Sequence, residues 1–123
     1  MNRNLLIRAY EIIDGIPAKR FNLNATAINA SGPVDASDCG TIGCALGWLG
    51  LHPEFQALGL RTDPAGRLSY RGHGSWYATV GREFFGITYV EAERLFGPAG
   101  YTPGTTHKKM FLKRVREFLN AHP

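Results

Sequence analysis

The chain has 123 residues, 44% of them hydrophobic and 20% charged, which excludes an intrinsically disordered protein and is enough to bury one sizeable core. Fourteen Lys and Arg residues against ten Asp and Glu give a formal net charge of +4 at pH 7, which permits an acidic partner without requiring one. We therefore predict a single globular domain over residues 1–123.

Neither a secretory signal nor a membrane span is predicted. Residues 1–10 carry two arginines inside their apolar stretch, which a signal sequence does not. The longest apolar run without a charge, residues 39–51, falls short of the roughly 20 residues that cross a bilayer. Two cysteines, Cys39 and Cys44, are too few for a disulfide scaffold. These features predict a cytoplasmic protein that makes no membrane contact.

The first third of the chain predicts a helix followed by irregular structure. In residues 4–14 apolar side chains recur every three or four positions, and Gly15 followed by Pro17 provides a stop. Residues 20–23 predict a short extended piece, and residues 24–38, rich in Asn, Ser, Gly and Pro, predict a long loop. A loop of that length is either a contact surface or a solvated connection.

Residues 38–51 predict a central helix. The segment is apolar on every side, as is typical of a helix buried in the middle of a domain, with Asp38 or Thr41 as its N-cap and Pro53 setting its end. Its small-residue face would consist of Gly40, Gly43, Gly47 and Gly50. Such a face allows either close packing of another backbone or a ligand slot beside Trp48.

The middle of the chain predicts a helical turn and a hairpin. Pro53 suits the first position of a short helical turn over residues 53–57. Residues 60–70 then predict a β-hairpin whose turn is built on residues 63–66. Residues 71–75 predict a flexible loop flanked by glycines.

Two helices are predicted after that loop. The first begins after Ser75, its N-cap, and ends at Gly86, with Trp76, Val80 and Phe84 on one face.

The next helix opens with Thr88 and Glu91, which form a capping box. Its apolar contacts are Val90, Leu95 and Phe96, and a Gly-Pro pair ends it.

A last helix begins at Thr105 or Thr106 and runs to about residue 120. Its predicted apolar face consists of Phe111, Leu112, Val115, Phe118 and Leu119. Together the elements predict a mainly α fold of the α+β class, with about five helices around the buried glycine-rich helix and one small β-hairpin.

Three stretches of the chain form a recognisable pattern: Phe21-Asn22-Leu23, then Cys39-Gly40-Thr41-x-x-Cys44-x-x-Gly47-Trp48, and then Phe85-Gly86-Ile87-Thr88-x-x-Glu91-Ala92-x-x-Leu95-Phe96. Together they resemble a family of small uncharacterised bacteriophage, prophage and proteobacterial proteins. The resemblance covers most of residues 17–120 and implies no particular activity. It implies a phage or prophage setting, in which small accessory proteins often bind and block a host protein.

Cys39 is the candidate nucleophile, and His73 is the candidate base. A helix N-terminus lowers the pKa of a thiol, so this pair could serve a cysteine hydrolase. However, the separation of Cys39 from Cys44 does not match the papain-group signature, and Asp38 would raise the pKa of its neighbour. Cys44 is interpreted as a packing residue, and zinc on Cys39, Cys44 and His52 has poor ligand spacing. The sequence therefore favours a non-enzymatic protein without metal or cofactor.

All of the net charge lies in the predicted last helix. Residues 105–123 hold five Lys and Arg and one Glu, whereas residues 1–104 hold nine basic and nine acidic residues. The predicted binding residues are Lys108, Lys109, Lys113, Arg114, Arg116, Arg71 and His73. The alternative to a binding role is that these cations form a face that contacts only solvent.

We predict a phage-type interaction protein that binds and inhibits a host macromolecule, first of all a protein with an acidic surface, with help from the glycine-rich loops 71–75 and 97–104. Nucleic-acid binding through the same basic helix is the alternative function, because phosphates also attract a basic helix.

Overall fold

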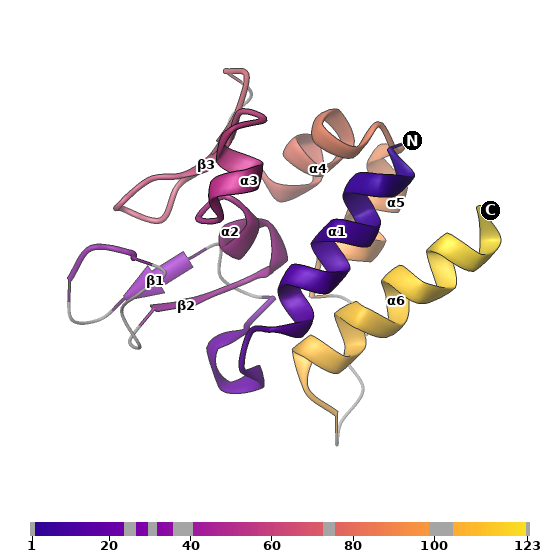
Figure 1. Ribbon diagram of the computed structural model, residues 1–123, viewed down its shortest axis with the longest axis horizontal. Coiled ribbons are helices and arrows are strands. Elements are labelled where there is room, and N and C mark those ends of the chain that lie inside the picture. The colour runs from indigo at the N-terminus through magenta and orange to yellow at the C-terminus, as the bar shows by residue number, and fades with distance from the viewer. Residues whose placement is uncertain are drawn as a thin grey trace.

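The computed structural model describes residues 2–23, 27–29, 32–35, 41–72, 76–98 and 105–122. Within these ranges helices dominate, and they share one hydrophobic core with two small antiparallel sheets (Figure 1). The α-helices are α1 (Arg3–Asp14), α2 (Ala45–Leu49), α3 (Pro53–Gln56), α4 (Tyr77–Phe85), α5 (Tyr89–Phe96) and α6 (His107–Ala121). A 3-10 helix, η1, spans Ala18–Arg20. The mainly α fold with a minor β component is confirmed.

The four strands are β1 (Ala27–Asn29), β2 (Thr41–Gly43), β3 (Leu60–Thr62) and β4 (Leu68–Tyr70). They form two separate antiparallel pairs, β1 with β2 and β3 with β4. The second pair is the predicted hairpin, and its turn has the expected chemistry. Gly66 adopts φ +85°, and the Asp63 carboxylate accepts a hydrogen bond from the Arg67 amide at 2.8 Å.

The N-terminal and C-terminal helices lie side by side and run in opposite directions (Figure 1). At one end of the pair, the Arg3 guanidinium donates to the carbonyl oxygens of Leu119 and His122, at 2.8 and 2.9 Å. At the other end, the Lys108 ammonium donates to the Asp14 carbonyl at 2.8 Å. These bonds supply donors to carbonyls at helix ends, where intrahelical donors run out. The two ends of the described chain are therefore held together by side chains.

A chain of phenylalanines joins the elements through the core. Ring centroids lie 5.8 Å apart for Phe21 and Phe111, 5.9 Å for Phe111 and Phe96, and 5.4 Å for Phe96 and Phe85. These rings come from the segment after η1 and from α6, α5 and α4. Because offset aromatic pairs add to the free energy of burial, this chain fixes how α6 sits on the rest of the fold.

The prediction of one helix over residues 38–51 is wrong for residues 41–44, and residues 38–40 lie outside the described residues. Thr41–Gly43 forms strand β2, and helix α2 begins only at Ala45, capped by Cys44 in an extended conformation. Of the two proposed N-caps, Thr41 is in the strand and does not have that role, and Asp38 lies outside the described residues. The second half is correct, because every residue of α2 is buried.

Strand β2 is stabilised by pairing with β1, which is distant in the sequence. Ala27 pairs with Gly43 and Asn29 with Thr41 across the β1–β2 ladder, which local helix signals cannot reveal. The predicted loop over residues 24–38 is therefore also wrong in part, since it contains β1. The extended piece predicted over residues 20–23 begins instead with the last residue of η1, and then Phe21 bridges to Gly43.

The glycine face does not form as predicted, because its members belong to different elements. Gly43 is in β2, Gly47 is in α2 and Gly50 follows α2, while Gly40 lies outside the described residues. The Gly47 carbonyl accepts a hydrogen bond from the Thr62 hydroxyl at 2.9 Å, and a β-carbon on Gly50 would lie 2.7 Å from the Thr62 amide nitrogen. Gly50 therefore allows β3 to approach the end of α2 closely, which favours packing over a ligand slot.

The local signals around α4 and α5 are largely confirmed. Gly86 ends α4 in a left-handed conformation at φ +66°. Two predicted core contacts are wrong: Trp76 precedes α4 and is 54% exposed, and Val90 faces outward and is 53% exposed. The proposed cap Ser75 lies outside the described residues.

Thr88→Ala is expected to lower the free energy of unfolding by about 1 kcal/mol. The Thr88 hydroxyl accepts from the Glu91 amide at 3.1 Å, and the Glu91 carboxylate accepts from the Thr88 amide at 2.9 Å. Alanine removes the first bond and leaves a helix amide without its partner. Urea denaturation of both proteins measures the difference, with Thr88→Ser as the control that retains the hydroxyl. Equal stability of Thr88→Ala and wild type would contradict the capping role.

Candidate functional site

Three of the predicted basic residues form an exposed stripe on α6. Lys109, Lys113 and Arg116 follow one another at a spacing of four and then three residues, so they share one side of the helix, and all three are exposed. We call them the α6 cationic face. The opposite side of α6 is buried in the core, where its members are Met110, Phe111, Leu112 and Val115. Burial of this side therefore leaves the cationic face directed outward.

Two other predicted binding residues are not directed outward. The Lys108 ammonium reaches the Asp14 carbonyl, as described above. The Arg114 guanidinium donates to the Gly97 carbonyl at 2.7 Å and to the Met110 sulfur at 3.4 Å. Burial lowers the pKa of Arg114, as expected for a cation taken partly out of water. These two cations hold α6 against its neighbours, so the prediction that they belong to an outward basic face is wrong.

The remaining predicted binding residues lie elsewhere. Arg71 stacks over the Tyr70 ring at 5.2 Å after the β3–β4 hairpin, and Figure 1 shows that hairpin on the opposite side of the molecule from α6. The structure therefore does not bring Arg71 together with the α6 cationic face. His73 lies outside the described residues.

Of the two cysteines, the structure describes only Cys44. Cys39 lies outside the described residues, whereas Cys44 is buried and its sulfur accepts a hydrogen bond from the Gly47 amide at 3.5 Å. Burial raises the pKa of the Cys44 thiol, because the charged thiolate is poorly solvated there. The prediction that Cys44 is a packing residue is confirmed.

Cys44 is expected to react with iodoacetamide in the folded protein at least about tenfold more slowly than a free thiol at the same pH, since the thiolate is both rare and enclosed. Mass spectrometry of labelled peptides measures the rate, and the protein in denaturant provides the control. Because Cys39 is labelled in the same experiment, its rate tests the hydrolase alternative. Labelling of Cys39 no faster than a free thiol near neutral pH would remove that alternative.

Two of the described histidines accept hydrogen bonds from backbone amides, one of them distant in the sequence and one nearby. His107 Nδ1 accepts from the Leu23 amide at 2.9 Å, and His52 Nδ1 accepts from the Glu54 amide at 3.2 Å. Within the described ranges no three His, Cys, Asp or Glu side chains come together as a metal site would require. No helix there is long and apolar enough to cross a membrane.

Exposed apolar side chains gather where α4 and α5 begin, a feature the sequence analysis missed. The Trp76 indole donates to the Tyr89 hydroxyl at 2.6 Å, and Tyr89 and Val90 are themselves exposed. We call these three residues the apolar patch. Tyr77 packs beside it, with ring centroids 4.7 Å apart from Trp76, and burial raises the pKa of Tyr77. Large exposed aromatic side chains are typical of protein interaction surfaces.

Searches of family models, curated proteins and solved structures gave no match. A groove also adjoins the apolar patch.

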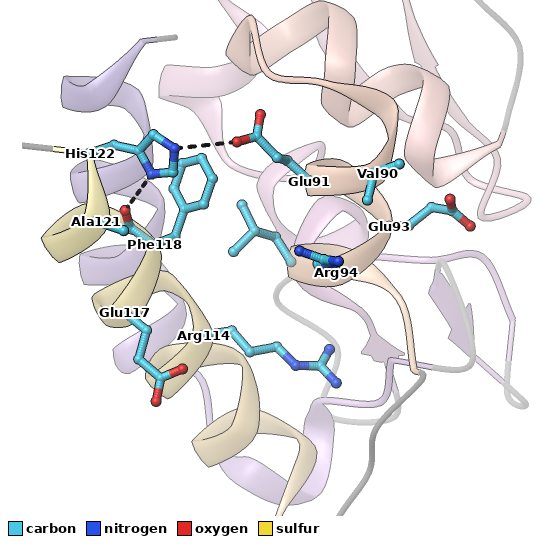
Figure 2. Close-up of a pocket in the computed structure, with 10 residues that line it drawn as sticks. Val90, Glu91, Glu93, Arg94, Arg114, Glu117, Phe118, Ala121 and His122 are labelled. Carbon is cyan, nitrogen blue, oxygen red and sulfur yellow. Dashed lines mark hydrogen bonds and ion pairs between the residues drawn. The ribbon is translucent and has the colours of Figure 1, made fainter.

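The groove lies between α5 and α6 and has an open volume of about 680 Å³ (Figure 2). Its lining comes from both helices and consists of Val90, Glu91, Glu93, Arg94, Leu95, Arg114, Glu117, Phe118, Ala121 and His122. One end is closed by His122 Nε2, which lies 3.4 Å from Glu91 Oε2. Val90 belongs to both the groove and the apolar patch, so the two are continuous. We call this feature the α5–α6 groove.

Proposed function

We propose that this chain is a non-enzymatic binding module that presents the α6 cationic face to an acidic surface of a partner protein. The observation that supports this most is the exposure of Lys109, Lys113 and Arg116 on one side of a helix whose other side is buried. Residues 1–104 have no net charge, so the positive field is concentrated on this helix. A concentrated field of one sign steers oppositely charged partners during encounter.

A protein is favoured over a nucleic acid by what surrounds the cations. Glu117 lies 3.9 Å from the Lys113 ammonium, so the positive charge is confined to three side chains, few for a nucleic-acid track. The apolar patch supplies Trp76 and Tyr89, residue types that contribute strongly to protein–protein binding. Charge beside exposed aromatic side chains is typical of a protein interface.

The setting we propose is the cytoplasm of a bacterial host. The stretches that resemble small phage and prophage proteins support this, since such accessory proteins often bind and block a host protein. In this proposal the partner is a host protein, and binding inhibits it.

Titration with a fluorescent DNA duplex at rising salt separates the two kinds of partner. We expect no micromolar binding at about 50 mM salt, because three exposed cations give only a weak nonspecific affinity. Micromolar or tighter binding that falls steeply with salt would contradict the proposal and make a nucleic acid the partner.

A further inference from the structure

We propose that an aromatic site at the start of α4 and along α5 binds an arginine side chain of the partner protein. The site consists of Trp76, Tyr77, Tyr89 and Glu93, and it shares its tryptophan and one tyrosine with the apolar patch. The inference goes beyond the α6 cationic face, because it assigns the partner a positive group at a second place. It rests on the proposed function only in taking the ligand from a protein.

Contacts between the two helices bring these four residues together. Tyr89 and Glu93 are four residues apart on α5, so they share one side of that helix, and both are exposed. The Trp76 indole donates to the Tyr89 hydroxyl at 2.6 Å, and its ring centroid lies 4.7 Å from that of Tyr77. A β-carbon on Gly97 would lie 2.6 Å from both the Tyr77 hydroxyl and the Glu93 carbonyl oxygen. The aromatic rings therefore follow α5 from Tyr89 to the turn that carries Glu93.

Trp76 presents an aromatic ring to a ligand, not a hydrogen-bond donor. The residue is 54% exposed, but its indole N–H is already used by the Tyr89 hydroxyl. Its ring packs against the Tyr77 ring at an interplanar angle of 42°, and the rest of the ring is open. The face of an aromatic ring carries the negative part of its quadrupole, so it attracts a cation.

The charge of the aromatic site is negative. Figure 2 shows the Glu93 carboxylate pointing away from α6, and Arg94 does not share that side of α5 because successive residues of a helix point in different directions. Burial, and then the nearby Glu93 carboxylate, raise the pKa of Tyr77. A carboxylate beside ring faces attracts a cation, repels an anion and loses its hydration beneath a wholly apolar ligand. A cation is therefore the ligand that matches the whole site.

Contacts of this kind already occur twice in the fold. The guanidinium carbon of Arg20 lies 4.9 Å from the centre of the Trp48 ring, and that of Arg71 lies 5.2 Å from the centre of the Tyr70 ring. A guanidinium is planar and weakly hydrated, so it stacks on a ring and can donate to a carboxylate at the same time. An arginine of the partner would stack within about 6 Å of the Trp76 ring centroid and donate to the carboxylate of the site.

The test follows the indole N–H signals of both tryptophans by NMR during titration with N-acetyl-arginine amide. Trp48 is 4% exposed and is the internal control. N-acetyl-citrulline amide has nearly the same shape without the charge, and N-acetyl-leucine amide tests an apolar occupant. The variant Glu93→Gln removes the carboxylate of the site, and Glu11→Gln, at an exposed glutamate of α1, is its matched control.

We expect the arginine probe to shift the Trp76 signal, and to bind at least about fivefold more tightly than the citrulline and leucine probes. Glu93→Gln is expected to weaken its binding by about threefold or more, while Glu11→Gln leaves it unchanged. Equal affinity for the arginine and citrulline probes, tighter binding of the leucine probe, no shift at Trp76, an equal shift at Trp48, or unchanged binding to Glu93→Gln would overturn the inference.

The proposed function is judged separately: it fails if reversal of the α6 cationic face leaves binding of poly-L-glutamate unchanged, whatever the aromatic site binds.

Discussion

Phe111→Ala is expected to lower the free energy of unfolding by about 3–5 kcal/mol. The Phe111 side chain is fully buried, and its ring lies between those of Phe21 and Phe96, at 5.8 and 5.9 Å. Alanine leaves a cavity and separates α6 from both aromatic partners. Because α6 packs on α1, η1 and α5, little of the fold can relax to fill that space.

Urea denaturation monitored by circular dichroism measures this change. Ile28→Ala, at an exposed position of β1, is the control and is expected to change the free energy by no more than about 0.5 kcal/mol. A loss below about 1 kcal/mol for Phe111→Ala would show that α6 is not part of the core.

Charge reversal on the α6 cationic face is expected to have a large effect on the affinity for an acidic ligand. The triple variant Lys109→Glu, Lys113→Glu and Arg116→Glu is expected to weaken binding of poly-L-glutamate by at least about 100-fold, since three attractive charges become repulsive. The matched control reverses three other exposed arginines, Arg61, Arg67 and Arg82. Both variants take the formal net charge from +4 to 4 − 6 = −2, so a difference between them depends on position alone. Fluorescence anisotropy measures both affinities, and equal losses would contradict a localised surface.

Elements defined by nearby residues could be predicted from the sequence. The Thr88 and Glu91 capping box needs only residues three apart, and the turn at residues 63–66 closes within itself. The segment 38–51 could not be predicted in this way. A short apolar run suits a buried strand as well as a helix, and pairing with β1 decides between them for Thr41–Gly43.

The candidate binding surface could likewise be predicted only in part from the sequence. The composition of the chain placed the positive charge in the last helix, which the structure confirms. Composition could not predict which of these cations face outward. That depends on acceptors far away in the sequence, such as the Asp14 carbonyl for Lys108. Trp76 was predicted to be core because of its spacing from Val80 and Phe84, yet it precedes the first turn of α4 and lies in the apolar patch. Periodicity cannot distinguish these positions, because it does not report which turn of a helix is covered.

Capture of partners from a bacterial host lysate tests the central claim most directly. Wild type, the α6 triple variant and the matched arginine variant are immobilised after circular dichroism has shown equal folding, and bound proteins are quantified by mass spectrometry. The account predicts that an acidic host protein is retained by wild type and by the arginine variant and is lost from the α6 variant. Recovery of the same proteins by all three would contradict the claim that Lys109, Lys113 and Arg116 form the contact surface.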